Sequence, residues 1–94
     1  MKIKVILVDD HAVVRAGFKM LLATDERIEV IAEAERGEEA MQLYNTKQPD
    51  IMVMDISMPG IGGLEAIRRI YARDSHAKIL VFSVHNEQVF INQA

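Results

Sequence analysis

Short apolar runs alternate along this chain with segments in which apolar residues recur every three or four positions. The runs at residues 3–8, 28–34, 51–54 and 78–82 predict β-strands. The segments at 13–22, 38–46 and 64–71 have helical spacing, and a further helix is expected to begin near Asn86. Strands that alternate with helices predict a parallel sheet with helices on both faces.

Local signals refine these elements. Asp10 is expected to cap the first helix, and Gly37 is expected to form a turn before the second. The apolar positions expected to mark the inner side of the second helix are Ala40, Met41 and Tyr44, and those that mark the third helix are Leu64, Ile67, Ile70 and Tyr71.

Composition narrows the class of protein. A chain of 94 residues allows one domain, and 50% hydrophobic with 27% charged residues is typical of a folded domain. The absence of cysteine excludes a disulfide framework and a cysteine nucleophile, and it agrees with a reducing, cytoplasmic compartment. No apolar run approaches the ~20 residues of a membrane helix. A net charge of -3 gives no reason to expect direct nucleic-acid binding.

Acidic residues stand where two of the predicted strands end. Asp9 and Asp10 follow the first strand, and Asp55 follows the third. Ligands of such sheets bind at the carboxyl ends of the strands. If these strands are neighbours, three carboxylates converge, and two charges ~5 Å apart repel by about 3 kcal/mol at an effective dielectric of ~20. A hard cation relieves that repulsion, so the cluster predicts a Mg²⁺ site; His11 is expected only at the surface or in packing, because Mg²⁺ prefers oxygen ligands.

A metal beside a carboxylate also suggests phosphoryl chemistry, in which the carboxylate attacks phosphorus. Asp55 is the better candidate for the nucleophile because it stands alone at its strand end. Ser83 ends the fourth strand, where its hydroxyl could bond a phosphoryl oxygen, and Gly60, Gly62 and Gly63 would let backbone approach closely.

Four pieces of the chain together carry a family resemblance. They are residues 8–11 (VDDH), residues 55–60 (DISMPG), Gly63 and Ser83. With them the chain resembles the receiver domain of two-component response regulators. Residues 14–17 (VRAG) further resemble regulators with a LuxR-type helix-turn-helix output, and residues 57–66 (SMPGIGGLEA) are similar to the GacA-like branch.

The resemblance implies a flavodoxin-like three-layer α/β sandwich with a parallel sheet of strand order 2-1-3-4. It also implies that Asp55 takes a phosphoryl group from a sensor histidine kinase in the presence of Mg²⁺. Asp10 and Asp55 would be direct metal ligands together with the backbone carbonyl of Ser57, while Asp9 would act directly or through water. Ser83 would be the hydroxyl switch that follows the phosphoryl group.

The chain departs from the family at its C-terminal end. The family has a fifth strand with a lysine, an aromatic switch residue and a fifth helix, which the 94 residues do not supply. Lys78 is no substitute, because it begins a strand at the opposite edge from the site. We therefore expect residues 1–94 to be a receiver domain that is incomplete at its C-terminus, cut from a longer transcription regulator. DNA would be contacted only through the missing output domain, no membrane contact is expected, and the uncovered fourth strand predicts self-association.

Two other functions fit parts of the pattern. An aspartyl-phosphate phosphatase or phosphotransferase of the haloacid-dehalogenase type would need a second aspartate where Ser57 stands. A flavin-binding module would need a loop rich in hydroxyls and glycine after the first strand, where Asp9 and Asp10 would repel a phosphate. Both rank below a non-enzymatic signalling module.

Overall fold

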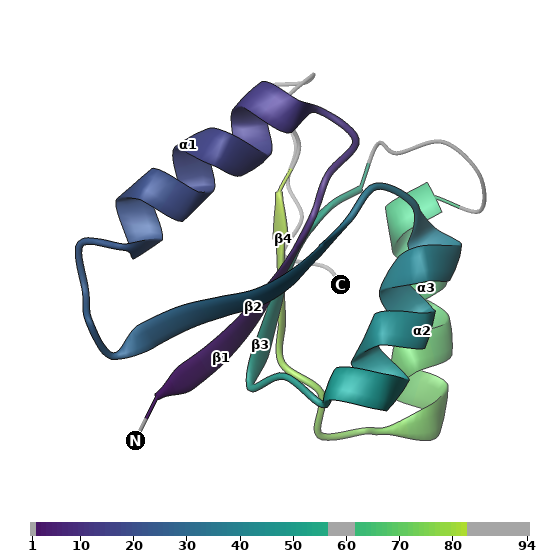
Figure 1. Cartoon of the computed structure of the whole chain (residues 1–94). Helices are drawn as coiled ribbons and strands as arrows, with labels where there is room; N and C mark the ends of the chain where they lie inside the picture. Colours follow the sequence, from purple (N-terminus) through teal and green to yellow (C-terminus); the bar gives the residue numbers. More distant parts are fainter. Residues whose placement is uncertain (1, 57–61, 83–94) are drawn as a thin grey trace.

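The fold is built on one parallel sheet of four strands in the order β2-β1-β3-β4 (Figure 1). The computed structural model describes residues 2–56 and 62–82. The strands are β1 (Ile3–Val8), β2 (Ile28–Ala34), β3 (Ile51–Asp55) and β4 (Ile79–Phe82). All neighbouring pairs are parallel, which confirms the predicted sheet and its order.

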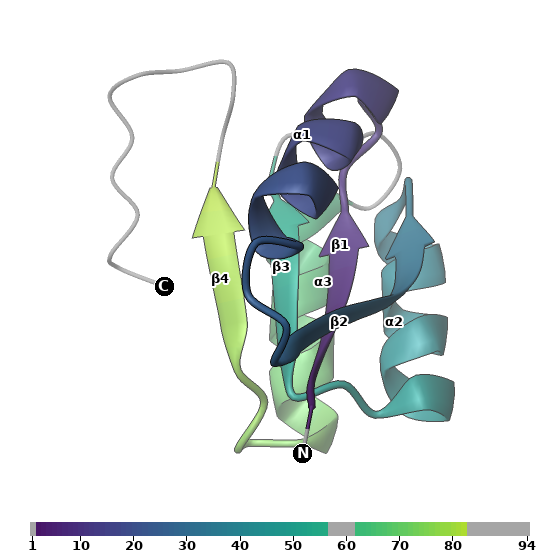
Figure 2. The ribbon, with the colours of Figure 1, turned by 60° about the vertical axis from the view of Figure 1, so that its left-hand side comes forward.

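Helices cover both faces of this sheet in the described part of the chain. α1 (Ala12–Leu22) lies on one face, and α2 (Gly37–Lys47) and α3 (Gly62–Arg73) lie side by side on the other (Figures 1 and 2). The arrangement is the flavodoxin-like three-layer sandwich that the sequence predicted. It requires a right-handed crossover at each helix, as parallel sheets do.

Alternation along the strands divides the apolar side chains into two cores. Ile6, Val8, Met52 and Met54 point to the α2–α3 side, where Ala66 and Ile70 meet them. The core on the α1 side is smaller and comprises Val5, Leu7 and Val53, with partly buried neighbours such as Phe18 and Leu22. Successive side chains of a strand point to opposite faces, so a strand buried in both cores is apolar throughout.

Two local expectations about helix starts are wrong. Asp10 does not cap α1: the N-cap residue is His11, it makes no side-chain cap bond, and its own N–H donates to Oδ1 of Asp9 at 2.9 Å. The strand passes into the helix through this short side-chain turn, which leaves Asp10 free of a capping role. Gly37 is the first residue of α2 and is buried, and the bend that precedes the helix lies at Glu35 and Arg36.

The inner side of α3 differs from the one that its apolar pattern marks. Ile67 and Ile70 are buried, but Leu64 is 59% and Tyr71 39% exposed. Gly63 and Ala66 are buried as well, and a Cβ atom at residue 63 would lie 2.5 Å from Cα of Ile56, so a larger side chain does not fit at that position. On α2, Ala40 is buried, and Met41 and Tyr44 pack partly buried against the core as predicted.

Some expectations fall on residues outside the described ranges. Ser57, Ser83 and the helix expected from Asn86 are among them, and so is Gly60. Among the described residues, no helix has both the length and the hydropathy needed to cross a membrane.

Candidate metal centre

The acidic residues converge at the carboxyl edge of the sheet, as the sequence predicted. β1 and β3 are neighbours, with Val8 opposite Met54, so Asp9 follows one strand beside Asp55, the last residue of the other. One potential ligand atom from each of Asp9, Asp10, His11 and Asp55 lies within 4.8 Å of all the others. The sheet order thus brings together acids that are 45 positions apart in the chain.

The three carboxylates differ in burial. Asp9 is 2% and Asp55 0% exposed, whereas the side chain of Asp10 is 32% exposed. The cluster therefore has a buried floor of two acids and an open side at Asp10.

His11 joins the cluster, although its sequence context predicted only a surface or packing role. Its Nδ1 lies 2.8 Å from Oδ1 of Asp9 and 3.1 Å from Oδ1 of Asp10. The hydrogen bond to Asp9, with smaller contributions from the nearby negative charges, raises the pKa of His11 above its ordinary value of 6.5. The sequence feature that could have indicated this contact is the position of His11 directly after Asp9 and Asp10. A short turn there places the imidazole ring against both carboxylates.

The donor atoms of the cluster fit a hard divalent cation. Oδ2 of Asp9 is buried and has no hydrogen-bond partner within residues 2–56 and 62–82, although Oδ1 accepts twice from His11. A buried carboxylate oxygen of this kind is costly unless a cation or a donor meets it. Carboxylate oxygens at a partly exposed site match the preference of Mg²⁺ for oxygen ligands.

Gly63 lies close against the end of β3 on the α3 side. A Cβ atom at residue 63 would lie 2.5 Å from Cα of Ile56 and 2.6 Å from the carbonyl oxygen of Asp55. The Gly63 N–H donates to the Ile56 carbonyl oxygen at 3.4 Å. The helix can therefore start against the end of β3 only because residue 63 has no side chain.

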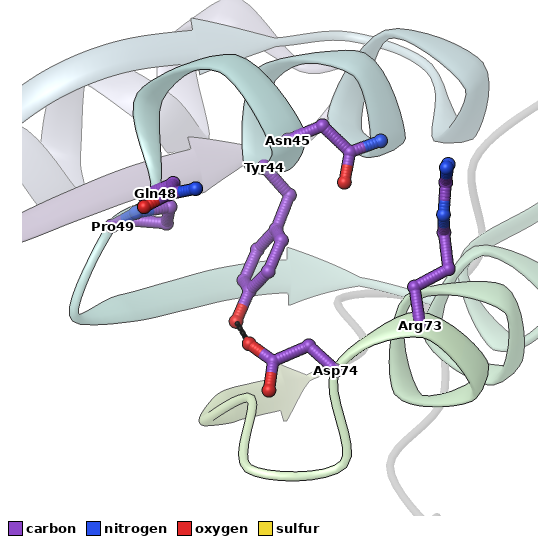
Figure 3. Close-up of a pocket in the computed structure, with 6 residues that line it drawn as sticks. All are labelled: Tyr44, Asn45, Gln48, Pro49, Arg73 and Asp74. Carbon is purple, nitrogen blue, oxygen red and sulfur yellow. Dashed lines mark hydrogen bonds between the residues drawn. The ribbon is translucent and has the colours of Figure 1, made fainter.

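A separate hollow lies at the other end of the sheet, between the end of α2 and the end of α3. Its volume is about 540 Å³, and Figure 3 shows its lining residues: Tyr44, Asn45, Gln48, Pro49, Arg73 and Asp74. Pro49 precedes β3, whereas Asp55 ends it, so the length of that strand separates the hollow from the acids. The hollow is therefore distinct from the acidic cluster.

Comparison with known proteins identifies the family. Residues 5–94 match the response regulator receiver domain. Response regulator UvrY of Escherichia coli K12 is 47% identical over 85 residues, which are 90% of this chain and 39% of that protein. Response regulator GacA of Pseudomonas aeruginosa is 42% identical over 88 residues, 94% of this chain and 41% of that protein.

A solved structure agrees. The two-component response regulator of the LuxR family from Aurantimonas sp. SI85-9A1 superposes with a TM-score of 0.85 at 43% identity, over 92% of this chain and 61% of that one. The chain spans about two fifths of the length of the curated relatives it matches. Together with the sheet order and the acidic edge, these matches show that the chain belongs to the response regulator receiver domain family, a family of regulatory modules, with LuxR-type regulators among its relatives.

Proposed function

We propose that Asp55 is the phosphoacceptor and that Asp9, Asp10 and Asp55 form the Mg²⁺ site that serves it. The observation that carries this proposal is the convergence of the three acids at the carboxyl edge, within 4.8 Å, in a chain of the receiver family. Asp10 and Asp55 are the direct ligands, and Asp9 acts directly or through water. When bound, Mg²⁺ neutralises the negative charge that develops on a transferring phosphoryl group.

The reaction is a transfer from a phosphohistidine of a sensor kinase. A carboxylate oxygen of Asp55 attacks phosphorus, the P–N bond breaks, and its electron pair returns to the imidazole of the kinase. The product is an aspartyl phosphate, and no water is consumed. The chain contributes the nucleophile and its orientation, because β3 and Gly63 fix the backbone of Asp55.

Asp55 rather than Asp9 is the nucleophile because of their surroundings. Oδ1 of Asp9 accepts from both the backbone N–H and the ring of His11, at 2.9 and 2.8 Å. These bonds hold Asp9 in place as a ligand. Asp55 ends the strand that lies between β1 and β4, so its carboxylate is flanked by the acids on one side and by the end of β4 on the other.

The remaining roles extend the same proposal. By likeness to the family, the backbone carbonyl of Ser57 would be a further metal ligand and the hydroxyl of Ser83 would follow the phosphoryl group. Residues 1–94 are a receiver domain that lacks its C-terminal part, from a cytoplasmic regulator that contacts DNA through an output domain outside this chain. Support comes from the likeness to the LuxR-family response regulator from Aurantimonas and from the fact that the chain spans about two fifths of its curated relatives.

We also propose that this chain self-associates through β4. Within the described residues β4 pairs only with β3, so one edge of it carries unsatisfied backbone groups. Leu80 is 61% exposed on the face that α1 covers only in part. An apolar edge strand pairs readily with a second copy.

Phosphorylation of the purified chain by a small-molecule donor, acetyl phosphate with Mg²⁺, tests the central proposal. We expect a mass gain of one phosphoryl group that hydroxylamine removes, as it does from acyl phosphates. Asp55→Asn should abolish the gain, and the matched control Glu26→Gln, at an exposed acid away from the edge, should keep it. A hydroxylamine-resistant product, or one that persists in Asp55→Asn, would overturn the assignment.

A further inference from the structure

Arg15 is the basic side chain that reaches the backbone of the acidic edge. It lies in the first part of α1, and only 14% of its side chain is exposed. Its Nη1 donates to the carbonyl oxygen of Asp9 at 2.6 Å, and its Nε donates to Oε1 of Glu33 at 2.8 Å. The Arg15 guanidinium therefore links the residue that follows β1 to a residue near the end of β2, on the face that α1 covers.

The backbone of Asp9 is consequently held at both of its polar groups. Its N–H donates to the carbonyl oxygen of Ala34 at 3.0 Å, while its carbonyl oxygen accepts from Arg15. The next two residues are Asp10 and His11, so the peptide that Arg15 grips is the one that leads into the acidic turn. A shift of this peptide would move both carboxylates of the pair.

Glu33 anchors the guanidinium in turn. Its Oε1 accepts from Arg15 and its Oε2 accepts from Nζ of Lys19, each at 2.8 Å. These two bonds lower the pKa of Glu33 below its ordinary value, so the carboxylate stays charged. Nη2 of Arg15 also lies 3.6 Å from Oε2 of Glu35. The planar fork of arginine suits such a set of fixed acceptors, whereas lysine provides only one point of attachment.

We propose that Arg15 is a positioning residue for the cation site: its guanidinium, anchored on Glu33, fixes the Asp9 peptide and so sets the spacing of the carboxylates that bind Mg²⁺. This inference rests on the proposed function. It differs from that function in a testable way, because it concerns a residue that touches neither metal nor phosphoryl group. Partners that orient metal ligands commonly affect metal affinity by about 10–100-fold.

The sign of the effect separates positioning from simple electrostatics. Arg15 is a positive charge beside a cation site, so removal of that charge alone would strengthen Mg²⁺ binding. If Arg15 positions Asp9, its removal weakens binding instead. Arg15→Lys keeps the charge but loses the fork, so electrostatics predicts no change and positioning predicts a loss.

The experiment measures Mg²⁺ affinity of the unphosphorylated protein by competition with Mn²⁺, followed by electron paramagnetic resonance. We expect about tenfold weaker binding in Arg15→Met and Arg15→Lys, and a smaller loss in Glu33→Met, which removes the oxygen that accepts from Arg15 Nε. Lys19→Met is the matched control: it removes a positive charge bonded to the same Glu33 but no contact with Asp9, and it should bind as tightly as the wild type or more tightly.

The outcomes are distinct. Equal or tighter binding by a folded Arg15→Met or Arg15→Lys overturns the inference but leaves the metal site standing. If neither Arg15 variant folds, Glu33→Met decides, because unchanged affinity without that acceptor also overturns the inference. Absence of binding in the wild type overturns the proposed metal site itself.

Discussion

The hydroxyl of Tyr44 donates to Oδ2 of Asp74 at 2.7 Å and so joins the last turns of α2 to the residue that follows α3 (Figure 3). The two residues are 30 positions apart in the chain. The bond crosses one side of the hollow opposite the acidic edge, and Tyr44 also packs against the main core. It therefore stabilises the helical layer without touching the proposed site.

Tyr44→Phe should lower the free energy of unfolding by about 1 kcal/mol, because it removes one partly exposed hydrogen bond and leaves the ring packing in place. Urea denaturation measures the change. Phosphorylation of Asp55 should be unaffected, since the length of β3 separates the two ends of the sheet. A loss of phosphorylation in a stable Tyr44→Phe protein would contradict this separation.

The same pair predicts a pH dependence of stability. Burial and then the bond to Asp74 raise the pKa of Tyr44 from 10.0 to about 12. A raised pKa stabilises the fold below the unfolded value, so this contribution is complete below pH 10 and is lost as the pH rises through about 12. The bond from Tyr44 lowers the pKa of Asp74, so at the acid end stability falls as the pH drops through the lowered value. The difference in unfolding free energy between wild type and Tyr44→Phe should be largest between these two limits.

Gly63→Ala should destabilise the fold by about 1–3 kcal/mol and reduce phosphorylation of Asp55, because the new Cβ would overlap the backbone at Ile56 and Asp55. Gly17→Ala is the control. A Cβ at residue 17 meets nothing within 4 Å, and this residue lies inside α1, so the substitution should stabilise by up to about 1 kcal/mol. Thermal unfolding and the phosphorylation assay measure both; equal behaviour of the two variants would refute the close approach.

Mutual repulsion at the acidic edge makes a prediction that needs no phosphoryl donor. When a chelator keeps the protein free of divalent cations, Asp55→Asn should raise the free energy of unfolding by about 1–3 kcal/mol, because one of three neighbouring negative charges is removed. In the wild type, Mg²⁺ at ten times its dissociation constant should add about 1.4 kcal/mol, and in the variant much less. Denaturation with and without Mg²⁺ measures both, with Glu26→Gln as the charge-matched control. An identical Mg²⁺ response in all three proteins would remove the case for the site.

Self-association through β4 is tested by sedimentation velocity over a range of protein concentrations. Leu80→Lys should shift the population to monomer without loss of the fold, because residue 80 is already 61% exposed. Met20→Lys, at a 75% exposed position on α1, should leave association unchanged. A wild-type chain that remains monomeric at every concentration would falsify the proposal.

Much of the fold could be predicted from sequence because each strand is a short apolar run with a clear end. Asp9 and Asp55 mark two of those ends, and parallel topology alone places them at one edge. The contacts of His11 and Arg15 could not be predicted in the same way. They depend on how tightly the chain turns after β1 and on which face of α1 meets β2, and neither property leaves a periodic signal.

The exposed apolar positions show a second limit. Val13 and Leu21 are 84% and 64% exposed although they follow the helical spacing of α1. The three- and four-residue spacing of apolar residues indicates that α1 has an apolar side. The sheet covers only the part of that side that contains Phe18 and Leu22. Gly63 shows the opposite case. It is buried although it has no apolar side chain, because the helix comes so close to the end of β3 that no side chain fits there.

The register of β1 and β2 shifts between Val5 and Ile6, so that Val5 lies opposite Val30 and Ile6 opposite Ala32. Val30 and Glu33 are an odd number of residues apart, and an unbroken strand would turn them to opposite faces. The bulge adds one residue to β2 at this point, so both Val30 and Glu33 face α1. Val30 packs against the smaller core, and Glu33 accepts the hydrogen bond from Arg15. The alternation of inward and outward side chains along β2 is therefore reversed on the two sides of the bulge. The number of residues between Val30 and Glu33 therefore decides which side chain faces α1. With the bulge it is the carboxylate of Glu33, and without it an alanine would take that place.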